Sequence, residues 1–195
     1  MSIDNYQYNA FVSGIRIIPR LKERRAGMYS KGDYISYGNS GVCEVMGTEV
    51  MESSIGSADG RICYILRPLH DQSCKIMTPV DNQKVIMRDL ISPEETRQLL
   101  EDIPHLETLP EQSARQQEIS YSKALHSGSC REWFSLVKTL NQRIAIRREK
   151  GKKITATDDR YFKAATEKLI EEFSVVLGMD SMQTKELLMD SFEEM

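Results

Sequence analysis

Hydrophobic and polar residues alternate along the first half of the chain in a way that is typical of β-strands. In one segment, apolar side chains recur at Ile62, Tyr64 and Leu66, and every second residue of a strand points to the same face. Turn-forming residues such as Gly38-Asn39-Ser40-Gly41 separate such segments from one another. These patterns predict five short strands, at Tyr34–Tyr37, Val42–Met51, Arg61–Pro68, Lys75–Thr78 and Val85–Met87.

After residue 92 the pattern changes to helical spacing. In Ser92-Pro93-Glu94-Glu95 a serine N-cap, a proline at the first helical position and a glutamate three residues after the cap form a capping box. Farther on, Trp133, Leu136, Val137 and Leu140 recur at the spacing of one helix face. The sequence predicts helices near 93–102, 112–126, 129–149, 156–177 and 181–193.

These elements indicate an α+β fold with two domains. Five strands in roughly 60 residues are typical of a small SH3-like or Tudor-like β-barrel, which we expect over residues 28–92. The apolar stripes of the helices must be buried against one another, so residues 93–195 are expected to form one compact all-α bundle.

Residues 1–27 differ from the rest of the chain in their weak periodicity. They hold five basic and two acidic residues, and the sequence predicts a disordered extension. A second hypothesis is that Met28 is the native start, because Glu23-Arg24-Arg25 can be encoded by a purine tract resembling a ribosome-binding site. Mass spectrometry of the native protein would distinguish the two.

Composition narrows the class of protein. Hydrophobic residues make up 40% of the chain and charged residues 28%, as in ordinary soluble globular proteins. No apolar run approaches the roughly 18 residues that span a bilayer, and no secretory leader is recognisable, so we expect a cytoplasmic protein without a membrane contact. The four cysteines match no zinc template and are expected to be small buried apolar groups.

No motif indicates catalysis. The sequence lacks the phosphate-binding, nucleophile-elbow and zinc-protease signatures. Acidic pairs such as Glu94-Glu95 and Asp158-Asp159 fall at predicted helix starts, where the helix dipole and capping account for them. We therefore expect no enzyme activity, no cofactor, no metal and no small-molecule substrate.

Two features leave alternatives open. The segment Lys138–Lys153 holds seven basic residues and one acidic residue in a chain of net charge −3. It is either a solvated helix end, where cations favour the helix dipole, or a patch that contacts phosphates. Likewise, Trp133 is either a core residue of its apolar stripe or an exposed anchor for nucleic acid or a partner protein.

The order of several short motifs resembles the CarD/CdnL family of bacterial RNA-polymerase-binding transcription factors. Shared elements near the start include Gly32-Asp33, Tyr37 and Gly41-Val42. The resembling segments, in chain order, are MYSKGDYISYGNSGVCEV, YILRPL, KIMTPVDN, RDLIS, HSGSCREWFSLVKTL and KKITATDDRYFKAATEKLIEEFSVVLG. Each motif alone is weak, whereas their order over residues 28 to about 190 is fairly specific.

The resemblance implies that the barrel docks on the β subunit of RNA polymerase. An open edge strand suits this role, because its free backbone groups can pair with a partner strand. By position, Met51, Met77 and Pro79 fall where members of the family contact polymerase. The alternative for the two methionines is core or edge packing.

The resemblance also implies that the helical domain lies against promoter DNA. The tryptophan that wedges into the minor groove in this family is absent here, since its position falls near Ala114. Tyr121, two helical turns on, is a partial substitute at best. The residues expected to contact DNA are therefore basic: Arg143, Arg147, Arg148, Lys150, Lys152, Lys153, Arg160 and Lys163.

Two functions are consistent with the sequence. The first is a transcription regulator that binds polymerase through its barrel and modulates promoter opening or open-complex stability through its helices. The second is a protein–protein adaptor that docks on polymerase without productive DNA contact. The missing tryptophan favours the adaptor, and the basic segment favours the regulator.

Overall fold

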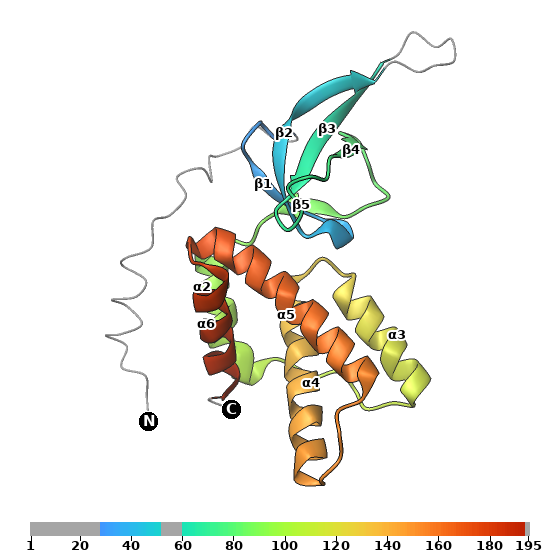
Figure 1. Cartoon of the computed structure of the whole chain (residues 1–195), viewed down its shortest axis with the longest axis vertical. Helices are drawn as coiled ribbons and strands as arrows, with labels where there is room; N and C mark the ends of the chain where they lie inside the picture. The colour runs from blue at the N-terminus through green and yellow to red at the C-terminus, as the bar shows by residue number, and fades with distance from the viewer. Residues whose placement is uncertain (1–27, 52–59, 194–195) are drawn as a thin grey trace.

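The computed structural model describes residues 28–51 and 60–193. A β-sheet domain comes first along the chain and lies at one end of the molecule, and the helices form the other end (Figure 1). This arrangement confirms the predicted α+β fold. The expectations for residues 1–27, including Met28 as the native start, concern a segment that lies outside the described residues.

The sheet has five antiparallel strands in the order β4-β3-β2-β1-β5. Each of the first three strands has the predicted bounds, and β4 begins one residue later than predicted. The strands are β1 Tyr34–Tyr37, β2 Val42–Met51, β3 Arg61–Pro68, β4 Ile76–Pro79 and β5 Met87–Asp89. A short 3-10 helix, η1 (Gly38–Ser40), occupies the turn between β1 and β2.

The prediction for the last strand was displaced by two residues. Pairing with β1 fixes the position of β5, since Ile35 lies opposite Asp89 and Tyr37 opposite Met87. Val85 instead packs at the edge of the sheet core before the strand begins. A hydrophobic pattern of three residues could not distinguish the packed approach from the paired strand.

One face of the sheet carries its core. Ile35, Val45, Tyr64 and Leu66 are buried there, together with Cys43 and Tyr37. A β-bulge between Val45 and Gly47 inserts one extra residue into β2. Ile62 shares the face of Tyr64 and Leu66, as predicted, but it lies beyond the core and is exposed.

All five predicted helices are present. They are α2 Pro93–Glu101, α3 Ala114–Leu125, α4 Cys130–Glu149, α5 Ala156–Leu177 and α6 Ser181–Glu193, with a 3-10 turn η2 at Ile103–His105. The capping box forms as expected. The Glu95 amide donates to Ser92 Oγ over 3.1 Å, and the Ser92 amide donates to Glu95 Oε2 over 2.9 Å.

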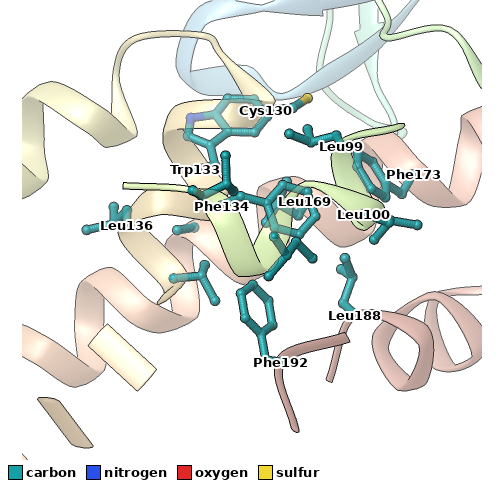
Figure 2. Close-up of a cluster of buried hydrophobic side chains, with 14 of the residues drawn as sticks. Leu99, Leu100, Cys130, Trp133, Phe134, Leu136, Leu169, Phe173, Leu188 and Phe192 are labelled. Atoms are coloured by element: carbon teal, nitrogen blue, oxygen red, sulfur yellow. The ribbon is translucent and has the colours of Figure 1, made fainter. Parts of the chain in front are cut away.

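The helices enclose one aromatic core. Trp133 and Phe134 of α4 pack with Phe173 of α5 and Phe192 of α6 (Figure 2). Trp133 is 2% exposed, and its indole nitrogen donates to the Leu125 carbonyl over 3.0 Å. The core interpretation of this tryptophan is therefore confirmed.

Three of the four cysteines are buried apolar groups, as predicted. These are Cys43, Cys63 and Cys130, whereas Cys74 is half-buried. Burial raises the pKa of the Cys43 thiol to about 12 and raises that of Cys130 as well. Both thiols are therefore protonated at neutral pH, in keeping with a packing role.

Candidate functional site

The strand register places the three residues expected to contact polymerase on one face of the sheet. Met51 lies opposite Arg61, Pro79 opposite Cys63, and Met77 opposite Ile65. Because Arg61, Cys63 and Ile65 alternate along β3, all of these side chains share the face away from the sheet core. We call this face of β2, β3 and β4 the outer face.

The methionines of the outer face are exposed. Met51 is 48% and Met77 41% exposed, so neither lies in the sheet core, and Pro79 is half-buried. Met77 and Pro79 belong to β4, which is an edge strand. Their position leaves apolar, flexible side chains at an edge strand of the described sheet. Their contact with polymerase stays a prediction.

Charged side chains elsewhere on the outer face pair with one another. Arg67 Nη2 lies 2.6 Å from Glu44 Oε2, and Lys75 Nζ lies 3.3 Å from Glu49 Oε1. The area near Met51 and Met77 is therefore bordered by these two charge pairs and by the exposed Arg61, which lies opposite Met51.

The turn between β1 and β2 contacts α5 and is not part of the outer face. The amide of Val42 donates to Glu171 Oε2 over 3.1 Å, and His70 Nδ1 lies 3.4 Å from Glu171 Oε1. A Cβ added at Gly41 would lie 2.0 Å from Glu171 Oε2, and the residue has a φ of +66°. Glycine thus allows the carboxylate to approach the turn, so this turn fastens the sheet domain to the helices.

A second contact between the domains is centred on Glu172, which is 1% exposed. Its carboxylate accepts two hydrogen bonds from the Arg88 guanidinium, at 2.7 and 2.8 Å, and one from the Ile91 amide at 2.9 Å. Arg88 also donates from Nε to the Gly128 carbonyl and lies over the Trp133 ring. This buried bidentate pair fixes the junction of the domains.

One signal for this junction is visible in the sequence. Glu172 interrupts the apolar stripe of α5 between Leu169 and Val176, and an acid in a buried stripe requires a cationic partner. Nothing in the local pattern identified Arg88, which is 84 residues away in the chain.

At the other end of the helical domain, the chain turns from α4 into α5 through a basic loop. The Gly151 amide donates to the Arg148 carbonyl over 2.9 Å, and the Lys152 amide donates to the Arg147 carbonyl over 2.8 Å. This pair of bonds is a Schellman motif. Arg147 Nε also donates to the Lys153 carbonyl over 2.9 Å. We call residues 147–153 the basic corner.

Four of the predicted DNA-contacting residues are available at the basic corner. In the part of the chain that the structure describes, no ion pair involves Arg148, Lys150, Lys152 or Lys153, and all four are exposed. Positions that usually make the apolar contact of a Schellman motif hold Arg147 and Lys152 instead. The loop therefore holds a group of cations in a defined conformation.

The remaining predicted residues are engaged within the chain. Arg143 lies 3.7 Å from Asp158 and 3.8 Å from Glu111. Two further pairs are Arg160 with Glu118 at 2.7 Å and Lys163 with Asp159 at 2.8 Å. Of the eight predicted residues, three are thus in ion pairs, Arg147 donates to a backbone carbonyl, and the four of the basic corner named above have no ion pair among the described residues.

Two other sequence interpretations of the helical domain change. Lys138, counted in the basic segment, is buried, and its Nζ donates to three carbonyls at 2.7–3.0 Å, those of Ile103, Pro104 and Leu106. Tyr121 is 1% exposed, and burial raises its pKa to about 12. The burial of this tyrosine argues against the partial substitution for the missing tryptophan that the sequence left open. Ala114 is exposed at the start of α3.

Neither a metal centre nor a membrane span is found among the described residues. Within residues 28–51 and 60–193, no three His, Cys, Asp or Glu side chains gather closely enough to hold a metal ion. Among the described helices, none combines the length and apolarity needed to cross a bilayer.

Comparison with known proteins identifies the sheet domain. Residues 29–91, about a third of the chain, match the family model of the CarD-like/TRCF RID domain. No curated protein matches the chain. The matched residues run from the start of the described sheet domain to the junction at Ile91, and the predicted resemblance is confirmed over them. The family is one of RNA polymerase-interacting domains. Residues 29–91 of the chain are therefore similar to the CarD-like/TRCF RID domain.

Proposed function

We propose that this protein is a non-enzymatic regulator of transcription in bacteria that docks on the β subunit of RNA polymerase. Docking uses the outer face, with Met51, Met77 and Pro79 in the contact. The family match carries the proposal, because the matched domain is the one that bears this face. Such a partner places the protein in the cytoplasm.

The chemistry of the outer face supports this role. Methionine side chains are flexible and polarisable, so they adapt to an apolar surface. The paired charges beside them do not repel a partner of either sign. Exposed apolar groups at an edge strand are typical of surfaces that bind another protein.

In this proposal the helical domain acts on promoter DNA through the basic corner. Lys and Arg contacts to phosphate carry no base information, so the contact is not sequence-specific and depends on docking to polymerase. If the docked protein binds the open complex better than the closed one, it shifts the population toward the open state by that difference in affinity.

A binding experiment with the full chain tests the docking. The double variant Met51→Lys/Met77→Lys is expected to lose most of its affinity for core RNA polymerase, since two charges would be desolvated at an apolar contact. Met182→Lys is the matched control, because Met182 is a 78% exposed methionine of α6. Equal affinity of the double variant and the control would contradict docking through the outer face.

The second candidate is an adaptor that docks on polymerase without productive DNA contact. The ion pairs of Arg143, Arg160 and Lys163 within the chain favour it, since they reduce the charge available to DNA. A protein that binds polymerase but leaves the open-complex lifetime unchanged would be such an adaptor.

A further inference from the structure

The end of the β2–β3 hairpin exposes apolar side chains on both of its faces. Val50 lies directly opposite Ile62, and they are 64% and 44% exposed. Register places this pair on the same face as Tyr64 and Leu66, which is opposite to the face of Met51. Figure 1 shows β2 and β3 running together away from the helices.

This two-sided exposure is unusual for an antiparallel ribbon. An antiparallel strand commonly buries one face and presents polar residues to water on the other. Along β3 the core face is buried at Tyr64 and Leu66, but at Ile62 the same face is uncovered and remains apolar. On the outer face this end carries the exposed Met51, which lies opposite Arg61, and Met77 follows farther along the sheet, opposite Ile65.

Three exposed apolar residues, Val50 and Met51 of β2 and Ile62 of β3, are thus gathered at the hairpin end. Exposed Met77 of β4 lies farther along the sheet, opposite Ile65. Single exposed apolar residues are common on protein surfaces, whereas a contiguous group marks a surface that a partner covers. Docking on the outer face alone would cover Met51 and Met77 and leave the Val50–Ile62 pair in water.

We propose that RNA polymerase contacts the hairpin end on both faces, with Val50 and Ile62 forming a second apolar contact opposite to Met51 and Met77. The inference rests on the proposed docking, because the two contacts adjoin along the same strands. The partner surface is apolar, since no charged residue belongs to the Val50–Ile62 pair. β-Branched side chains of this kind lose little rotamer freedom when a partner covers them.

The test measures the affinity of the full-length Val50→Thr/Ile62→Thr variant for core RNA polymerase. Threonine keeps the β-branched shape and the strand preference but places a hydroxyl in the contact. We expect the dissociation constant to rise about tenfold or more, as for a central apolar contact. The control is Ile119→Thr, which makes the same change at a 54% exposed isoleucine of α3 and should leave the affinity unchanged.

Three results would overturn the inference. If Met51→Lys/Met77→Lys weakens binding but the threonine variant does not, docking stands and the second contact is wrong. If the wild-type chain does not bind polymerase, the proposed function itself fails. If the threonine changes abolish self-association in sedimentation while polymerase binding persists, the face binds a second copy of the chain. Matching thermal unfolding midpoints of the variants would exclude misfolding as the cause of weaker binding.

Discussion

A single carboxylate, that of Glu172, carries much of the contact between the two domains. It is buried, and it accepts hydrogen bonds from two nitrogens of Arg88 and from the Ile91 amide. A buried carboxylate is stable only when such donors replace its water of hydration. The side chain of Arg88 is 26% exposed and that of Glu172 is 1% exposed, so the guanidinium reaches solvent while the carboxylate lies inside the junction.

Glu172→Ala should lower the free energy of unfolding by roughly 3 kcal/mol, because it leaves the Arg88 guanidinium partly buried without its partner. Urea unfolding followed by circular dichroism measures the change. Glu167→Ala serves as the control, because Glu167 is an exposed residue of the same helix. Similar decreases for the two variants would show that the ion pair is not the source of the stability.

Two glycines with positive φ differ in ψ and in what surrounds them. Gly41 has a φ of +66° and a ψ of −140°, outside the left-handed helical region, and it lies against Glu171. Gly151 has a φ of +65° and is the C′ residue of the Schellman motif, and an added Cβ there would meet nothing within 4 Å. Alanine should therefore be more strained at Gly41 than at Gly151. At Gly41 it should also displace the carboxylate from the Val42 amide.

We expect Gly41→Ala to be more destabilising than Gly151→Ala by at least about 1–2 kcal/mol, the value of a hydrogen bond to a charged group, because the greater backbone strain at Gly41 adds to the lost contact. Thermal or urea unfolding of the two variants measures the difference. Equal destabilisation would mean that Glu171 moves aside at no cost and that the turn contact contributes little.

At the scale of elements, helices and strands could be predicted from the sequence where the hydrophobic pattern was long or where a helix cap had a specific sequence signature. The five helices and the first three strands could be predicted because periodicity, the capping box and the glycine turn all indicated the same structure. The position of β5 depended on pairing with β1, which lies about fifty residues earlier in the chain. A pairing over that distance leaves no local signal.

The candidate site was predictable in part for a similar reason. The alternation of strand residues places Met51, Met77 and Pro79 on one face once the register is known. Which cations are available could not be predicted, because the acids that pair with Arg143 and Arg160 belong to other segments. The burial of Lys138 likewise depends on three carbonyls more than thirty residues earlier in the chain.

The basic corner provides a prediction for the α4–α5 connection. Replacing Arg148, Lys150, Lys152 and Lys153 by glutamine should weaken binding of the full chain to duplex DNA. The logarithm of the affinity should also depend less steeply on the logarithm of salt concentration, by about 0.9 for each phosphate that the variant no longer neutralises. Fluorescence anisotropy over a salt series measures both quantities.

The matched control neutralises Arg160 and Lys163, which are paired with Glu118 and Asp159. This change should leave the slope nearly as it was. A control that flattens the slope as much as the corner variant would show that the ion pairs within the chain open when DNA binds.

At the scale of the molecule, the sheet domain and the helices are joined by specific polar contacts rather than by a bare linker. Glu171 holds the β1–β2 turn, Glu172 holds Arg88, and Lys168 Nζ donates to the Gly38 carbonyl over 3.4 Å. Burial lowers the pKa of Lys168, which also lies over the Trp133 ring. The outer face and the basic corner are thus parts of one connected body.

Loosening this junction should separate docking from its effect on DNA. Glu171→Gln/Glu172→Gln should bind core polymerase with unchanged affinity, because neither residue lies on the outer face. This variant should change the open-complex lifetime by less than the wild-type chain does, because its helices are no longer held at a fixed angle to the sheet domain. Lifetimes are compared well below the unfolding midpoint, and an unchanged effect would show that a fixed angle is unnecessary.

The position of the junction on α5 has a consequence for exchanging domains between proteins. The α5 side chains that hold the sheet domain by hydrogen bonds, Lys168, Glu171 and Glu172, lie within five consecutive residues. A sheet domain transplanted from another protein would need to offer this short segment a glycine turn, a free amide and one arginine. Chimaeras that keep these three features should fold with a native junction, so the docking specificity of the protein can be changed without redesigning its helices.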